Sequence, residues 1–262
     1  FSATTDIWTS PNKKSFIILV VAYIVRTPGS WCLVSLDLER SLFQEAHNGD
    51  NIATKLIALI KGGGLDLTKC ISITTDNASN MVKGAADNPN LIRQACAVHT
   101  IELSVKRFVG DRGLQEVLKD CSAVVSHFSR SPKVSAYVSC WYVTAGNKFI
   151  TLKVAVKTRW WTKLTMLDSI FANEKTFNTM VTLDKAPASV KKLNWSKMRL
   201  MAVVLRPFAD AAKMLEGEKY PTGGLVASTV GFLRKTLVRM LEHEDETIQG
   251  ASKAALADVD QR

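Results

Sequence analysis

An almost wholly apolar run, SFIILVVAYIV from Ser15 to Val25, constrains the fold of this chain most. The run is too short to cross a bilayer, which takes about 20 apolar residues in a helix, and its β-branched residues favour a strand. An uninterrupted apolar strand belongs where both of its faces are covered. We therefore predict that this run is an inner strand of a sheet.

Two further strand patterns flank this run. Phe1 to Thr9 precedes it across the turn Ser10-Pro11-Asn12-Lys13-Lys14, and Trp31 to Leu38 follows the turn Arg26-Thr27-Pro28-Gly29-Ser30. Short turns join antiparallel neighbours. The first 38 residues therefore predict a three-stranded antiparallel meander.

The apolar period then changes. Asn51 to Ile60 has helical spacing, with Asp50 or Asn51 as the expected N-cap and three glycines after its end, and the β-branched stretch at 70–75 predicts a fourth strand. A strand, a helix and a strand form a crossover unit whose last strand runs parallel to a neighbour. This order describes the start of an RNase H-like fold, in which the fourth strand lies beside the first. Leu91 to Ala97 is a candidate fifth, edge strand.

From His99 onward, helical spacing dominates. Lys148 to Val156 is a candidate extended segment, and Pro207 is expected to kink or restart its helix. The predicted helices are Thr100–Val109, Gly113–Phe128, Trp160–Phe177, Trp195–Leu215 and Leu225–Leu241. We therefore predict an α/β chain: an RNase H-like mixed sheet in 1–98, followed by a large all-helical region in 99–262.

Two aspartates are placed for chemistry by this topology. Asp6 lies on the first predicted strand, and Asp76 follows the fourth, in the stretch CISITTDNASNM. If those strands are neighbours, the two carboxylates repel each other, and a hard divalent cation such as Mg²⁺ or Mn²⁺ would relieve the repulsion. Paired metal ions at such a site can cleave phosphodiesters. The simpler alternative is that Asp76 only caps a helix.

The positive charge is concentrated in the middle of the chain. The net charge is +10 overall, and residues 99–200 alone hold 17 lysines and arginines against 7 acids. Such a block is typical of polyanion binding, with nucleic acid the default partner. The alternative is a solvated basic face without a partner.

The remaining totals narrow the class of protein. Five scattered cysteines without a CxxC pair favour reduced thiols in an intracellular protein. We find no signal peptide, and an apolar content of 47% excludes general disorder. Because the first residue is not Met and lies in a predicted strand, we expect the sequence to be part of a longer protein.

Six segments occur in the same order as in the transposases of the hAT superfamily, which the chain resembles. Each is weak alone, but the ordered set is specific and covers nearly the whole chain. The segments are TTDIWTS around Asp6, HNGDNIA at 47–53, SITTDNASNM ending at Met81, CAVHTIEL from Cys96, TRWW from Thr158, and LRPF at 205–208 continuing to EKYPT at 218–222.

This resemblance implies an RNase H-like nuclease core with a helical insertion, which excises DNA transposons and joins them to new sites. It makes Asp6 and Asp76 the first two acids of a three-acid metal site. Cys96 and His99 become the CxxH motif beside that site, and Arg159 with Trp160 the RW motif. DNA would be the partner of a nuclear, homo-oligomeric intact protein, with no membrane and no small-molecule substrate.

The third acid, a Glu on a helix after the insertion, has no matching stretch before Arg262, nor do the zinc finger and dimerisation segment of the family. We therefore expect this chain alone to bind DNA without cutting it. One alternative is a domesticated or decayed transposase that binds DNA or protein without catalysis. Another is a different metal-dependent nuclease of the same fold, which the CxxH and RW motifs disfavour.

Several motifs have competing interpretations. Cys96 and His99 could instead be a buried thiol and a capping side chain, or could join Cys121 and His127 in a zinc site. We assign Trp160 to base stacking and Lys157, Arg159 and Lys163 to phosphate contacts, with Trp161 in the core; the alternative is a core Trp160. SRSPK at 129–133 resembles a phosphorylation site, but we interpret it as a turn that ends a helix. The acids of 242–246 are candidates for the third acid, but we interpret them as a solvated helix end.

Overall fold

The computed structural model describes residues 1–86, 91–130, 150–156, 159–217 and 219–261. The chain forms two compact units. The first comprises residues 1–100 and 215–226, and the second comprises residues 101–214 and 227–262. The first change of unit falls inside helix α3 (Ala97–Val109), close to the predicted change from strands to helices. Nothing in the sequence indicated that residues 215–226 group with the strands.

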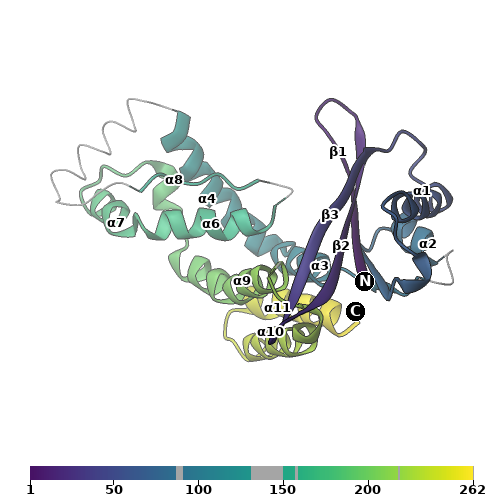
Figure 1. The fold of residues 1–262 in the computed structure, drawn as a ribbon. Coiled ribbons are helices and arrows are strands. Elements are labelled where there is room, and N and C mark those ends of the chain that lie inside the picture. Colours follow the sequence, from purple (N-terminus) through teal and green to yellow (C-terminus); the bar gives the residue numbers. More distant parts are fainter. Residues whose placement is uncertain (87–90, 131–149, 157–158, 218, 262) are drawn as a thin grey trace. The chain divides into compact units, whose positions relative to one another are not determined.

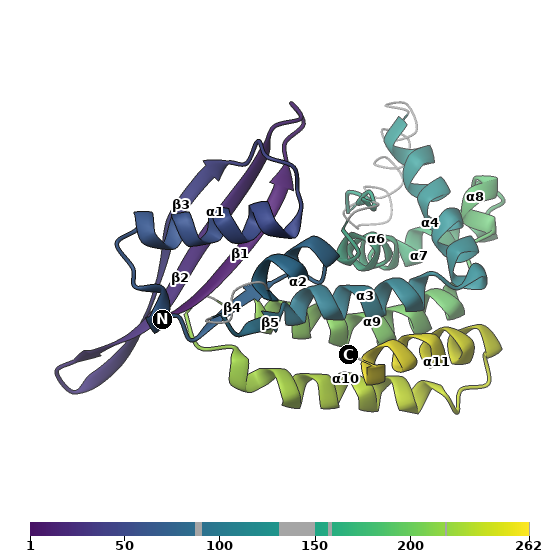
Figure 2. The ribbon, with the colours of Figure 1, turned by 90° about the vertical axis from the view of Figure 1, so that its right-hand side faces the viewer.

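In the first unit, the described residues form a five-stranded mixed sheet in the order β3-β2-β1-β4-β5 (Figure 2). The strands β1 to β3 pair antiparallel, whereas β4 pairs parallel with β1 and β5 parallel with β4. The predicted meander, the parallel fourth strand and the edge strand are thus confirmed. The strands are β1 (Ser2–Thr9), β2 (Ser15–Thr27), β3 (Ser30–Leu42), β4 (Ser72–Thr75) and β5 (Arg93–Ala95).

Helices α1 (Gly49–Gly62) and α2 (Ser79–Ala86) accompany the sheet, and α1 covers one of its faces (Figures 1 and 2). Alternation along the strands sends Ala3, Ile17 and Leu19 into a core with Ile52 and Leu56 of α1. The apolar stripe of α1 and this alternation therefore explain why the helix packs here. The 3₁₀ turn η1 (Leu67–Lys69) leads from α1 to β4.

The start of α1 differs from the prediction. Asn48, rather than Asp50 or Asn51, is the N-cap, and its side chain accepts a 2.9 Å hydrogen bond from the backbone N–H of Asn51. The helix thus begins earlier than the apolar stripe, because a cap is set by backbone geometry rather than by the first apolar residue. At the other end Gly63 is the C-cap, as the glycine run predicts.

The expectation that both faces of β2 are covered holds only for part of its length. The strand pairs with β1 as far as Ala22, and from Tyr23 onward it pairs with β3 alone. Tyr23, Ile24 and Val25 are accordingly exposed, in the hairpin that projects beyond the sheet in Figure 2. The apolar run predicts a strand, but it does not indicate where the neighbouring strand β1 ends.

The second unit is helical in its described part. Helix α4 contacts α6, α8 and α11, and α7 contacts α8. Its elements, with those that straddle the boundary, are α3, α4 (Arg112–Arg130), α6 (Trp161–Phe171), α7 (Glu174–Thr182), α8 (Ala188–Lys191), α9 (Trp195–Leu215), α10 (Val226–Met240) and α11 (Glu246–Gln261). The 3₁₀ turn η2 (Gly223–Leu225) belongs to the first unit.

Two helical predictions need correction, and one helix was not predicted. The predicted helix 160–177 is broken before α7, where the Asn173 side chain bonds to both the N–H and the C=O of Ile150. Helix α9 continues through Pro207, so no restart occurs there. Helix α11 was not predicted, since the positions it buries are mostly small or polar and give only a weak apolar stripe.

Two further observations complete the fold. Residues 150–156 have no regular structure, and the rest of the predicted extended segment, from Lys148, lies outside the described residues. None of the helices that the structure describes combines the length and the apolar character needed to span a bilayer.

Candidate functional site

The parallel register of β1 and β4 brings the two predicted acids together. Ser2 lies opposite Ser72 and Thr4 opposite Thr74, a constant offset of 70 positions (72 − 2). Asp6 and Asp76 keep this offset, although Asp76 lies just past the end of β4, and the charge of Asp76 acts on Asp6. Paired strands lie about 4.8 Å apart, so the two side chains leave neighbouring positions at one edge of the sheet.

The electrostatics of Asp6 reflect this neighbourhood. Its pKa is raised, first by desolvation and further by the negative charge of Asp76, although the backbone N–H of Ile7 and the His99 side chain both lower it. The bond from Ile7 to a carboxylate oxygen of Asp6 is 2.8 Å long. The side chain still reaches solvent, so it is accessible to a ligand. Asp6, Asp76 and His99 therefore share one electrostatic environment.

Asp76 occupies the turn between β4 and α2. One of its carboxylate oxygens accepts a 3.1 Å hydrogen bond from the backbone N–H of Ala78. Ala78 precedes the first residue of α2, so this bond stabilises the turn and does not cap the helix. A carboxylate has two oxygens and about four acceptor positions, so this bond and a second role are compatible.

The CxxH segment lies directly after β5, at the start of α3. The backbone N–H of Cys96 donates to the carbonyl of Thr75 at 2.8 Å, and Thr100 Oγ1 donates to the Cys96 carbonyl at 3.1 Å. His99, in the first turn of α3, is close enough to Asp6 to influence its pKa. The segment thus borders the pair of acids, as the resemblance implies.

A divalent cation suits the donor chemistry of Asp6 and Asp76, because both are hard oxygen ligands. Across the described residues, however, no group of three or more His, Cys, Asp or Glu side chains is placed to hold a metal. The zinc alternative loses support at Cys121, whose thiol is buried in α4. Desolvation, with the charge of Asp120, raises its pKa to about 12, and a protonated thiol is a poor zinc ligand.

The orientation predicted for the two tryptophans is reversed in the structure. Trp160 is only 2% exposed, whereas Trp161 is 44% exposed. Trp160 is spaced by four and seven residues from the buried Leu164 and Leu167, so all three share one helical face. The prediction placed Trp160 at the surface and was wrong, although this spacing was already readable in the sequence.

The basic residues at the start of α6 differ in how far their side chains are exposed to solvent. Arg159 is exposed, and Lys157 lies outside the described residues. The pKa of Lys163 is lowered, chiefly by desolvation and also by Lys106, while Glu102 opposes the change. The Lys163 side chain is therefore partly buried, near the charged side chains of Glu102 and Lys106 in α3. Trp161, which the sequence placed in the core, is exposed two positions after Arg159.

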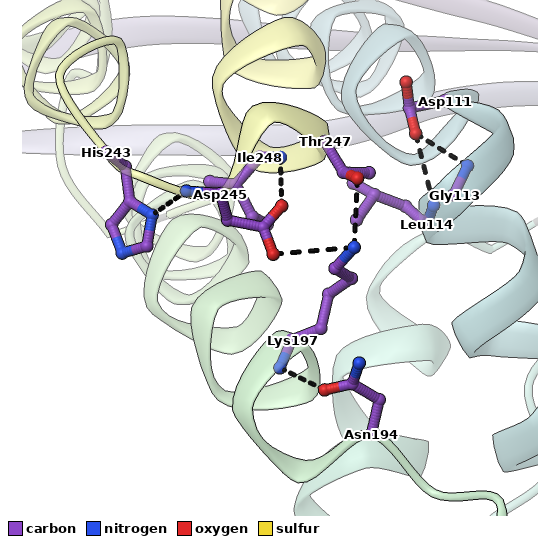
Figure 3. A network of polar contacts seen from close by, with 9 residues as sticks. All are labelled: Asp111, Gly113, Leu114, Asn194, Lys197, His243, Asp245, Thr247 and Ile248. Atoms are coloured by element: carbon purple, nitrogen blue, oxygen red, sulfur yellow. Dashed lines mark hydrogen bonds and ion pairs between the residues drawn. The ribbon is translucent and has the colours of Figure 1, made fainter.

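The acidic stretch 242–246 has a structural role at Asp245, drawn in Figure 3. Its carboxylate accepts the N–H of Ile248 at 3.1 Å, which caps α11, and lies 3.5 Å from the ammonium of Lys197. That ammonium also donates to Thr247 Oγ1 at 3.0 Å. Desolvation alone would raise the pKa of Asp245, but the Ile248 bond and Lys197 outweigh it and the pKa is lowered. Asp245 thus connects α9 with α11.

Comparison with known proteins gives two relatives of one kind. The chain is 22% identical to the Putative AC transposase of Zea mays over 86% of its own length, and 24% identical to the Transposable element Hobo transposase of Drosophila melanogaster over 97%. It spans only 29% and 36% of those two proteins. No model of a known protein family matches. The resemblance indicated by the motifs is therefore confirmed: over most of its length this chain is similar to two transposases, both of the hAT superfamily.

Proposed function

We propose that this chain is part of the catalytic region of a hAT-type DNA transposase, with an RNase H-like core in its first unit and the start of a helical insertion in its second. The observation that carries the proposal is the parallel β1–β4 register, because it makes neighbours of two aspartates that the sequence separates by 70 positions. The two transposase relatives support the same assignment. A nuclear location follows from the proposed work on chromosomal DNA.

The residues of the first unit have distinct parts in this proposal. Asp6 and Asp76 would hold Mg²⁺ or Mn²⁺, which when bound would activate a water and stabilise the leaving oxygen of a phosphodiester. His99, next to Asp6, would contact the phosphate that is cut. A further acid, supplied by the longer parent protein, would complete the ligand set. The chain of residues 1–262 would accordingly bind metal weakly and not cut DNA.

The second unit would hold the DNA. Most of the basic block of residues 99–200 belongs to it, and Arg159 with the exposed Trp161 would form one contact, with a phosphate and a base face respectively. Because Trp160 is buried, we transfer the stacking role to Trp161. Lys157 and Lys163 would add charge near the backbone. The intact protein would act as a homo-oligomer.

Metal-dependent strand cleavage by the intact parent tests the catalytic part. Asp6→Asn and Asp76→Asn should each reduce cleavage about a thousand-fold or more, which corresponds to about 4 kcal/mol of transition-state stabilisation. Asp37→Asn is the matched control, since Asp37 is a carboxylate on β3 that pairs with Arg40. Cleavage that survives both site substitutions would show that the acid pair is not the metal site.

Salt dependence of binding by this chain tests the DNA part. The logarithm of the binding constant should fall linearly with the logarithm of the salt concentration, by about 0.9 per neutralised phosphate of duplex DNA. Little sequence preference is expected, since phosphates carry no sequence information. Binding with a flat salt dependence would remove DNA from the role of the basic block.

The second candidate is a domesticated or decayed transposase that binds DNA or protein without cutting. It keeps the salt-dependent binding but predicts no metal-dependent cleavage by the intact parent. The two assays together therefore separate the candidates.

A further inference from the structure

Arg93 of β5 makes three hydrogen bonds to three consecutive residues at the end of β4. Its Nε donates to Thr75 Oγ1 at 2.9 Å, and its Nη2 donates both to the Asp76 carbonyl at 2.7 Å and to Asn77 Oδ1 at 2.8 Å. The backbone of Arg93 lies opposite Ile73, so the side chain extends along β4 toward its carboxyl end. One guanidinium thus spans the whole strand-to-turn junction.

All three acceptors are neutral oxygens: a hydroxyl, a backbone carbonyl and a side-chain amide. In these contacts Arg93 is not a counter-ion of the Asp76 carboxylate. It fixes the backbone that bears this carboxylate and leaves the carboxylate oxygens to the Ala78 N–H and to a ligand. A counter-ion bound to the carboxylate would instead compete with a metal for the same oxygens.

The contacts continue into the CxxH segment. Asn77 Nδ2 donates to Thr100 Oγ1 at 3.1 Å, and Thr100 Oγ1 donates to the Cys96 carbonyl. Cys96 in turn donates its N–H to Thr75. The turn that bears Asp76 and the start of the helix that bears His99 are therefore held in one closed set of hydrogen bonds, of which Arg93 is the cationic member.

We propose that Arg93 is a positioning residue, which fixes the turn from Thr75 to Asn77 so that the Asp76 carboxylate stays beside Asp6 in a geometry that can hold a divalent cation. This inference rests on the proposed function of the acid pair. It requires an arginine, because the planar fork donates in several directions at once, whereas a lysine is a point charge. Outer contacts of this kind typically change metal affinity by about 10- to 100-fold.

The discriminating variant is Arg93→Lys, which keeps the positive charge and removes the fork. Since the charge near the site is unchanged, any difference reports geometry rather than electrostatic repulsion of the cation. Mn²⁺ affinity of the full chain should fall about ten-fold. In the wild type, bound Mn²⁺ should broaden the amide signals of Ile7 and Asn77 alike; in Arg93→Lys, broadening should persist at Ile7 and weaken at Asn77.

A second readout needs no metal. The Ala78 N–H, which donates to Asp76, should exchange with solvent faster in Arg93→Lys, because the turn is no longer fixed. Arg40→Lys is the matched control: this exposed arginine of β3 pairs with Asp37, and its substitution should leave affinity, broadening and exchange unchanged. Should Arg93→Lys fail to fold, Asn77→Ala removes one acceptor of the same set and should give a smaller change in the same direction.

The outcomes separate this inference from the proposed function. If the wild type binds Mn²⁺ beside Ile7 and Asn77, and Arg93→Lys binds it equally well with unchanged Ala78 exchange, the positioning role is wrong and the metal site stands. If the wild type binds no Mn²⁺ there, the metal site is wrong. In that case, faster exchange of the Ala78 N–H in Arg93→Lys would still show that Arg93 fixes the turn. Unchanged exchange would show that it does not.

Discussion

Asp6 and Asp245 are two aspartates whose pKa values the fold shifts in opposite directions. Asp6 lies at the sheet edge beside a second acid, where desolvation raises its pKa. Asp245 lies at a junction of helices, where the Ile248 N–H and the Lys197 ammonium overcome desolvation and lower it. A carboxylate that serves stability is surrounded by donors, whereas Asp6 is held beside like charge. Charge kept in unfavourable surroundings is typical of functional sites.

The largest effect on stability is expected at Trp160. Replacing this buried ring in the helical unit by Ala should lower the free energy of unfolding by about 3–5 kcal/mol, through lost burial and the cavity left behind. Trp161→Ala is the matched control and should stay within about 0.5 kcal/mol of the wild type, while weakening DNA binding. Denaturant unfolding and binding assays measure both. A stable Trp160→Ala that loses DNA binding would return the stacking role to Trp160.

Replacing Asp245 should lower the stability of the protein. Asp245→Ala removes a helix cap and an ion pair and should cost about 1–2 kcal/mol at neutral pH. Asp245→Asn keeps a capping oxygen and should cost less. Because the folded pKa is lowered, the contribution of the charge is present above the unfolded pKa, about 3.9, and is lost as the pH falls through the folded value. Unfolding measured between neutral and acidic pH checks this, with the exposed Glu244→Gln expected to change little.

Replacing Asp6 should change stability in the opposite direction, and by the smallest amount of the three substitutions. Because its folded pKa is raised, the ionised carboxylate opposes folding above that pKa, and the protonated form carries no such cost. Asp6→Asn should therefore stabilise the protein at neutral pH, and the gain should vanish as the pH falls below the unfolded value. Asp37→Asn, which loses the pairing with Arg40, should show no gain. A destabilised Asp6→Asn would place Asp6 with Asp245 as a structural carboxylate.

Local patterns predicted the order and the pairing of the strands. The apolar runs and short turns of the first 38 residues allowed only a meander, and the helix before residues 70–75 required a parallel fourth strand. Once β4 lies beside β1, the positions of Asp6 and Asp76 follow from counting along the two strands. The register of two paired strands fixes which of their residues are neighbours. The proximity of Asp6 and Asp76 could therefore be predicted from the sequence.

The remaining features depend on contacts that no local pattern records. The break after α6 is set by Asn173, whose partner Ile150 lies 23 positions away, and the Arg93 contacts reach 16 to 18 positions back along the chain. The orientation of Trp160 is a different case, because a local pattern does record it. Its spacing of four and seven residues from Leu164 and Leu167 indicates the core, where the structure places it.

Titration of the Asp6 carboxyl by NMR tests the shared acid pair most directly. We expect a pKa above the ordinary value in the wild type and a lower pKa in Asp76→Asn, because one neighbouring negative charge is removed. Adding Mg²⁺ to the wild type should also lower the pKa of Asp6. An Asp6 pKa that is the same in the wild type and in Asp76→Asn, and that does not respond to Mg²⁺, would contradict the claim that these two aspartates form one site.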